Sequence, residues 1–228
     1  MIKNILWDLD GTLFDTYPSM TTAFADALKK EGVIIHYDEI FNLLKFNFNH
    51  CLTAVQHRYK LDVDNLLKNY LHNYKQISLD DQPPFKNVID VCKLIVKNGG
   101  KNVIVTHKDR AASETLLSEF NIKYLFFDSI TKDEKFPLKP NPAAFREIIQ
   151  RNNLNINETL AVGDRELDIV PGLKLDMKTC LFIDNKNNNL SEIKLSMPGK
   201  SFIYTNKIPA DLKIYNFKQL CDIIEDGV

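Results

Sequence analysis

Two carboxylates and a glycine stand near the start of the chain, directly after a short apolar run. Asp8 and Asp10 are two residues apart, and Gly11 follows at once. On an extended chain, residues two apart point the same way, so these carboxylates would repel each other unless a positive charge lay between them. A surface turn rich in Asp and Gly would contain the same residues. Whether this turn is functional therefore depends on what the rest of the chain places beside it.

The residues around this pair predict a parallel sheet. Residues 1–7 are typical of a buried strand that ends at the carboxylates. Beyond residue 83 the pattern alternates. Strands are expected at 103–106, 124–127, 159–162 and 180–183, helices at 88–96, 109–120 and 142–151, and a tail strand at 201–204 precedes a helix at 216–225. Such alternation predicts an α/β, Rossmann-like three-layer core, in which helices cover both faces of a parallel sheet.

A helical block interrupts this pattern after the first strand. Four helices are expected, at about 20–31, 38–46, 49–59 and 62–77, and no convincing strand lies among them. The paired prolines Pro83 and Pro84 then disfavour any continuation of the last helix. We therefore expect a catalytic core formed by residues 1–16 and 83–228, with an inserted helical domain at 17–82.

Polar residues follow several of the expected strands. Asp8, Thr106 and Asp164 each stand at or just past a strand end, and Lys139 precedes a helix. The carboxyl ends of parallel strands form the ligand crevice of an open α/β sheet. Each residue also has an ordinary explanation, such as a solvated lysine or a helix-start acid for Asp164 and Asp168. Together they favour a site in which carboxylates hold Mg²⁺ and the lysine and backbone amides bind phosphate.

These residues resemble the sequence motifs of the haloacid dehalogenase-like hydrolase superfamily. The first motif, Asp-x-Asp-Gly-Thr, fits residues 8–12, and the second, a strand-end Ser or Thr, fits Thr106. The third, a Lys often followed by Pro, fits Lys139, and the fourth, Gly-Asp-x-x-x-Asp, fits residues 163–168. The helical block is similar to the α-helical cap of the subgroup that contains phosphoglycolate phosphatase-like enzymes.

The resemblance implies an Mg²⁺-dependent phosphatase that hydrolyses a small phosphorylated metabolite through an aspartyl-phosphate. Asp8 would attack phosphorus, and Asp10 would protonate the leaving oxygen and then activate water. Mg²⁺ would be held by Asp8, the backbone carbonyl of Asp10 and Asp164, with Asp168 just outside the direct ligands. A sugar phosphomutase of the β-phosphoglucomutase type stays open as an alternative, although Met20 stands where those enzymes carry a hinge histidine. A non-catalytic binding module with this fold is a second alternative.

The expected phosphate-binding residues are Gly11, Thr106, His107 and Lys139. His107 departs from the pattern, because phosphoglycolate phosphatase-like relatives usually have Asn at this position. A lone histidine near a strand end is more often a structural hydrogen-bonding residue than a catalyst, and both roles stay open here. Arg165, inside the fourth motif, is equally ambiguous.

Composition favours a cytoplasmic protein acting on a small molecule. The net charge of −1 suggests no nucleic-acid partner, and no stretch approaches the length of a membrane span. The chain shows no signal-peptide pattern, and its four cysteines are far apart, as expected for reduced thiols. We expect a monomer or a homodimer.

Overall fold

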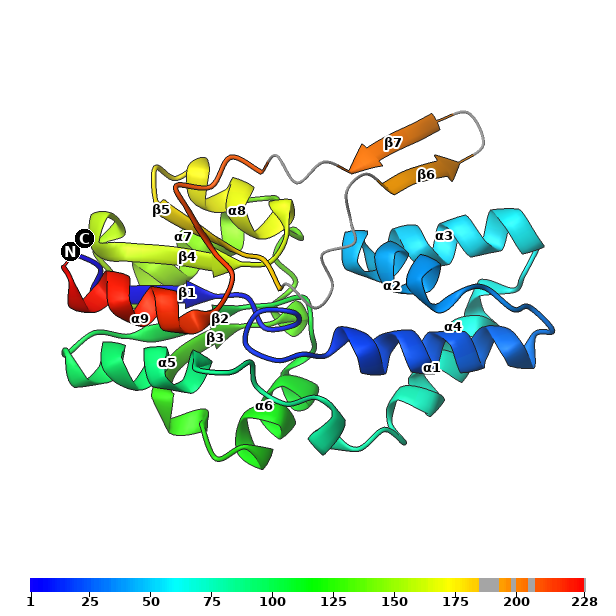
Figure 1. Cartoon of the computed structure of the whole chain (residues 1–228), viewed down its shortest axis with the longest axis horizontal. Helices are drawn as coiled ribbons and strands as arrows, with labels where there is room; N and C mark the ends of the chain where they lie inside the picture. Colours follow the sequence, from blue (N-terminus) through cyan, green and yellow to red (C-terminus); the bar gives the residue numbers. More distant parts are fainter. Residues whose placement is uncertain (185–192, 198–199, 205–207, 228) are drawn as a thin grey trace. The chain divides into compact units, whose positions relative to one another are not determined.

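The computed structural model of the chain describes residues 1–184, 193–197, 200–204 and 208–227 (Figure 1). The chain forms two compact units. The first consists of Met1–Asp15, Pro83–Asn188 and Ile208–Val228, and the second of Thr16–Gln82 and Asn189–Lys207. In the described part of the chain, no helix is long and apolar enough to cross a membrane.

A six-stranded sheet forms the centre of the first unit. Its strands are β1 (Asn4–Trp7), β2 (Asn102–Val105), β3 (Phe126–Ile130), β4 (Thr159–Gly163), β5 (Lys178–Phe182) and β8 (Leu212–Ile214). They lie in the order β3-β2-β1-β4-β5-β8, and every neighbouring pair is parallel. Parallel neighbours need crossover connections, which helices provide here. The fold confirms the predicted α/β, Rossmann-like class.

Helices cover both faces of this sheet. Successive side chains of a strand point to opposite faces, so each strand contributes residues to the core on both sides. Leu6 of β1 belongs to the cluster on one face, together with Phe145 and Ile148 of α7 (Ala143–Arg151). The Trp7 ring lies 5.9 Å from that of Phe217 on the other face. Helix α8 (Glu166–Leu173) contacts β4 and β5, and α7 contacts β2 and β3, whereas α5 (Val88–Lys97) and α9 (Phe217–Glu225) pack together on the opposite face (Figure 1). Trp7 also donates its indole N–H to Asn102 at 3.0 Å, so the polar atom of this buried ring is satisfied.

The helical unit has a hydrophobic core of its own. Its helices are α1 (Tyr17–Lys30), α2 (Tyr37–Phe46), α3 (Phe48–Tyr59) and α4 (Val63–Tyr74). Phe24 of α1 is fully buried and makes edge contacts with the rings of Phe48 and Tyr70. Asp62 begins α4 by accepting hydrogen bonds from two backbone N–H groups, as an N-cap residue should. The four predicted helices are thus present, with ends that differ by a few residues.

The third strand lies later in the sequence than predicted. Residues Lys123–Leu125 form a short 3₁₀ helix, and β3 runs over Phe126–Ile130 instead of 124–127. Tyr124 and Phe127 look like core residues in the sequence, yet both are exposed. Lys101 covers the Phe127 ring, with Nζ 4.0 Å from its centroid, which explains how an aromatic residue is accommodated on the surface.

The tail contains more strands than predicted. The expected strand at 201–204 is β7 (Lys200–Tyr204), which pairs antiparallel with β6 (Ile193–Met197). The last strand of the main sheet is β8, which was not predicted. Its three residues offer too short a pattern, and only Ile214 is buried.

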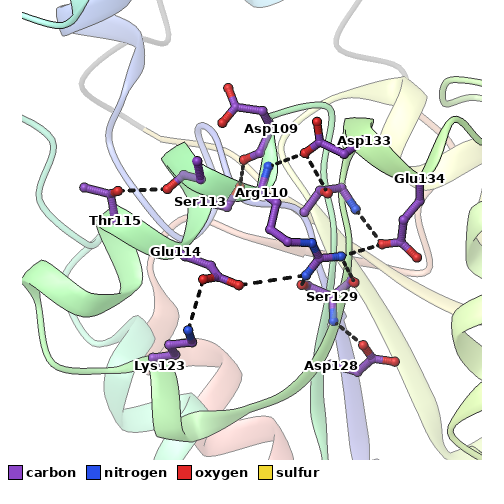
Figure 2. A network of polar contacts seen from close by, with 12 residues as sticks. Asp109, Arg110, Ser113, Glu114, Thr115, Lys123, Asp128, Ser129, Asp133 and Glu134 are labelled. Atoms are coloured by element: carbon purple, nitrogen blue, oxygen red, sulfur yellow. Dashed lines mark hydrogen bonds and ion pairs between the residues drawn. The ribbon is translucent and has the colours of Figure 1, made fainter.

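A surface network fastens the start of α6 (Arg110–Glu119) to the segment that follows β3 (Figure 2). The Arg110 backbone N–H donates to Asp133 at 2.6 Å, and its guanidinium binds Glu134 at 2.8 Å and Ser129 at 3.3 Å. Asp109 caps α6 by accepting from the Ala112 N–H. The network therefore ties together the two loops that follow β2 and β3.

Candidate active site

Three neighbouring strands each deliver one polar side chain to the same end of the sheet. Asp8 follows β1, Thr106 follows β2 and Asp164 follows β4, in each case as the first residue after the strand. Strand β1 lies between β2 and β4, so Asp8 is central and the other two flank it. All three side chains are buried, at 5% exposure or less. This is the edge at which open α/β sheets bind ligands.

The turn after Asp8 has a defined conformation. The Asp8 N–H donates to Val162 of β4 at 2.9 Å, which continues the pairing of the two strands. Gly11 has a φ of +80°, a conformation that glycine adopts without strain. Its N–H donates to the Phe14 carbonyl at 2.8 Å, so this amide serves the turn itself.

Lys139 joins two of the buried carboxylates. Its Nζ lies 2.6 Å from Asp8 Oδ1 and 2.5 Å from Asp168 Oδ1, and it also donates to the Val105 carbonyl at 3.1 Å. The side chains of all three charged residues are 1–2% exposed. Three charge-assisted contacts between buried groups fix the ammonium group directly beside Asp8.

The charges in this cluster are unequally compensated. Burial, and next the Asp168 carboxylate, raise the pKa of Asp8 to about 7, against the opposing effect of Lys139. Burial acts to raise the pKa of Asp168, but Lys139 and Arg165 together outweigh burial and hold this pKa below its ordinary value. Burial would lower the pKa of Lys139, yet the two carboxylates raise it. Lys139 is therefore protonated and Asp168 ionised, and Asp8 is the carboxylate whose ionised form is least stabilised by its neighbours.

Close packing holds Asp164 and Asp168 in place. The Thr12 hydroxyl donates to Asp164 Oδ1 at 3.5 Å, a contact that the sequence analysis did not identify. Gly163 must lack a side chain, because a Cβ there would lie 2.2 Å from the Cβ of Asp168. The spacing of the Gly-Asp-x-x-x-Asp segment thus brings Asp168 back against the strand end that carries Asp164.

Asp10 forms an ion pair with Lys108, a residue that sequence reasoning missed. Lys108 Nζ lies 3.0 Å from Asp10 Oδ1, and both side chains are mostly buried. The Thr106 hydroxyl accepts the Lys108 backbone N–H at 3.1 Å, which leaves the hydroxyl proton of Thr106 available to a ligand. The signal in the sequence was the position of Lys108, two residues after Thr106, in a loop that follows a strand end facing the site.

His107 binds the backbone of the lysine loop. Its Nε2 accepts the Lys139 N–H at 2.9 Å, which assigns the ring proton to Nδ1. Burial, with Lys139 as the next contribution, lowers the pKa of His107 to about 3. The imidazole is therefore neutral, and its observed contact is with Lys139.

Arg165 lies against the same carboxylates. Its Nε is 3.5 Å from Asp168 Oδ2 and 3.8 Å from Asp164 Oδ1, and its Nη2 is 3.9 Å from Asp8 Oδ2. The side chain is 12% exposed. The residue that the sequence left ambiguous thus contributes a second positive charge to the cluster.

The arrangement provides a set of hard oxygen donors. Oxygen atoms of Asp8, Asp164 and Asp168 lie within 4.8 Å of one another, so the three carboxylates could hold a metal ion. Within the described part of the chain, Asp8 Oδ2 is buried and has no hydrogen-bond partner. A divalent cation fits both observations, because it would satisfy this oxygen and neutralise the excess negative charge.

The chain belongs to the haloacid dehalogenase-like hydrolase family. The model of that family matches residues 5–182, which include Asp8, Thr106, Lys139 and Asp164. The resemblance inferred from the four motifs is therefore confirmed.

Relatives and solved structures of this family match nearly the whole chain. A glyceraldehyde 3-phosphate phosphatase from Methanocaldococcus jannaschii is 26% identical, over 99% of this chain and 98% of its own length. A phosphoglycolate phosphatase from Aquifex aeolicus is 24% identical, over 87% of this chain and 94% of its own length. The structure of a haloacid dehalogenase-like family hydrolase from Streptococcus pneumoniae matches with a TM-score of 0.74 and 16% identity, covering 98% of each chain. This structural likeness concerns the fold.

Proposed function

We propose that the protein is a metal-dependent phosphatase that hydrolyses a small phosphomonoester through an aspartyl-phosphate on Asp8. One observation carries the proposal: Asp8 is buried at the end of the central strand and bound to Lys139 through Oδ1, while its Oδ2 has no hydrogen-bond partner among the described residues. The names of relatives that match 99% and 87% of the chain support a phosphatase for small phosphorylated substrates. The fold by itself would not specify the reaction.

The metal ion is proposed to be Mg²⁺, held by Asp8, Asp164 and the backbone carbonyl of Asp10. Asp168 supports the site from outside, because its Oδ1 is bound by Lys139 and its Oδ2 by the Arg165 N–H. Bound Mg²⁺ would reduce the repulsion between Asp8 and a phosphate dianion.

The side chains around Asp8 have separate tasks. One carboxylate oxygen of Asp8 forms the bond to phosphorus while the leaving oxygen takes the electron pair of the bond that breaks. Lys139 screens Asp8 and stabilises charge on the phosphoryl oxygens, and the Thr106 hydroxyl donates to one of them. His107 holds the backbone of Lys139 and thereby positions its ammonium group.

Asp10 is proposed to serve as acid and then as base. It gives a proton to the leaving oxygen, and in its ionised form it takes a proton from the water that hydrolyses the aspartyl-phosphate. Lys108, 3.0 Å from Asp10 Oδ1, holds the carboxylate of Asp10 in place.

Hydrolysis of p-nitrophenyl phosphate tests the reaction and the metal together. We expect turnover with Mg²⁺, none in excess chelator, and a loss of about 10⁴-fold or more in Asp8→Asn. Glu134→Gln, in the surface network, is a matched carboxylate-to-amide control that should keep its activity. Full turnover in chelator, or an active Asp8→Asn, would contradict the proposal.

The helical unit is proposed to act as a cap that selects the substrate. Its longer segment leaves the catalytic unit after Asp15 and returns at Pro83, and these two residues are joined by a hydrogen bond of 2.9 Å between Asp15 N–H and the Pro83 carbonyl. Residues 17–82 can therefore be deleted with a short linker. The deletion should reduce turnover of the true metabolite far more than turnover of p-nitrophenyl phosphate, and equal losses would argue against a cap.

A further inference from the structure

Arg165 is the first residue after Asp164 and directly precedes α8, so its backbone lies beside the carboxylate cluster. The Arg165 N–H donates to Asp168 Oδ2 at 3.2 Å, which fixes the backbone. The side chain then folds over the cluster and is 88% removed from solvent. Long cationic side chains normally keep their charged end in water, so this burial needs a reason.

The guanidinium group faces three carboxylates at once. Its distances to Asp8, Asp164 and Asp168 range from 3.5 to 3.9 Å, which is longer than a strong hydrogen bond. It therefore acts on these groups mainly through its charge, which burial leaves poorly screened. Unlike Lys139, it is not locked to any one of them by a short contact.

The charges indicate what this contact accomplishes. Among the described residues, Asp8, Asp164 and Asp168 in their ionised forms face two cations, Lys139 and Arg165, which leaves one negative charge in excess. Without Arg165 the excess would be two. The direction of its effect on the pKa of Asp8 agrees, because Arg165 opposes the upward effect of burial and of Asp168.

We propose that Arg165 is a resident counter-ion of this cluster, which stabilises the site without metal and competes electrostatically with the divalent cation. It would thus set the affinity for the metal. This inference rests on the proposed function for one point only, namely that the metal ion binds at these carboxylates. A cation that binds there gains the attraction of three carboxylates but is repelled by a guanidinium within about 4 Å of each of them.

Binding of Mn²⁺, followed by the loss of the free-ion electron paramagnetic resonance signal, tests this role without any turnover. The proteins are the full-length wild type, Arg165→Gln, Arg165→Lys and the control Arg146→Gln, which removes an exposed arginine of α7. Arg165→Gln should bind Mn²⁺ about tenfold or more tightly than the wild type. Arg165→Lys keeps the charge and should stay close to the wild type, as should Arg146→Gln.

Thermal unfolding adds a second readout. In chelator, Arg165→Gln should melt below the wild type, because its carboxylates have lost a counter-ion. Saturating Mn²⁺ should close this gap, since the bound ion replaces the lost charge. A merely structural arginine would leave the gap open at every metal concentration.

The outcomes separate the two proposals. Unchanged or weaker Mn²⁺ binding in Arg165→Gln, with normal binding by the wild type, would overturn the counter-ion role and leave the metal site intact. Absence of binding in both proteins would overturn the metal site and the counter-ion role with it.

Discussion

The catalytic unit contains two networks of ion pairs that look alike in distance and differ in burial. In the cluster around Asp8, Lys139 lies 2.5–2.6 Å from its two carboxylates, and these side chains are 1–2% exposed. In the surface network, Glu134 binds Arg110 at 2.8 Å and Arg151 at 2.9 Å, with exposures of 24–44%. Bond length alone would rank the two networks as near equals.

Because they differ in burial, the two networks contribute differently to the stability of the protein. Exposed ion pairs are screened by water and salt, and each contributes little stability, so the surface network chiefly holds two loops together. The buried cluster gains strong attraction, but it also carries the cost of removing several charges from water. A core of apolar residues would be as stable without that cost. We therefore interpret the cluster as a functional site, and the rest of the fold offsets the cost of burying its charges.

Removal of Lys139 should produce the largest change in stability. Lys139→Met leaves Asp8 and Asp168 buried without the ammonium that binds both, and we expect a loss of about 3–5 kcal/mol in the free energy of unfolding. Urea unfolding in chelator measures it. The matched variant Arg151→Met, in the surface network, should lose no more than about 1 kcal/mol. Equal losses would remove the distinction between the two networks.

Protonation of His107 in acid should lower the free energy of unfolding, by less than the removal of Lys139 does. The folded pKa of about 3 lies below the ordinary value of 6.5, so the unfolded chain binds the extra proton between these values. Stability from the neutral ring is complete above about pH 6.5 and is lost as the pH falls, by at most about 1.4 kcal/mol per unit. His107→Gln keeps an acceptor for the Lys139 N–H without a titrating group.

The measurement for His107 is the free energy of unfolding between about pH 6.5 and 4.5. The wild type should lose stability across this range more steeply than His107→Gln. Parallel curves for the two proteins would mean that the imidazole is not held neutral in the folded state.

The smallest effect is expected in the surface network. Glu134→Gln weakens the contacts to Arg110 and Arg151, and it should reduce the free energy of unfolding by no more than about 1 kcal/mol. The difference should shrink further in high salt, because exposed charges are screened. Thermal unfolding at low and high salt checks this. A large loss that persists in salt would show that the network is coupled to the buried site.

The parts of the site that follow from strand order were predictable from the sequence. Asp8, Thr106 and Asp164 are strand-end residues, and a parallel sheet collects such residues at one edge whatever the details of packing. Contacts made by side chains of loops were harder to predict from the sequence. The position of Lys108 just past a strand end placed it near the site, but its pairing with Asp10 and the folding of Arg165 over the carboxylates depend on tertiary packing. Strand β8 was missed for a related reason, since a strand of three residues, of which only Ile214 is buried, carries too little periodicity.

The division of labour between Asp8 and Asp10 is the central claim about the reaction. Asp10→Asn retains the nucleophile but lacks the base for hydrolysis of the aspartyl-phosphate, a function worth about 10²- to 10⁴-fold. The leaving group p-nitrophenolate needs little protonation, so the first step should survive. The variant should therefore react once and then stall as a phosphoenzyme.

Rapid-quench kinetics of Asp10→Asn with labelled p-nitrophenyl phosphate tests this most directly. The account predicts a burst of p-nitrophenolate close to one equivalent of enzyme, a slow steady state, and label on the peptide that contains Asp8. Absence of a burst would show that the second step is not the one Asp10 controls. Label on any residue other than Asp8 would contradict the assignment of the nucleophile.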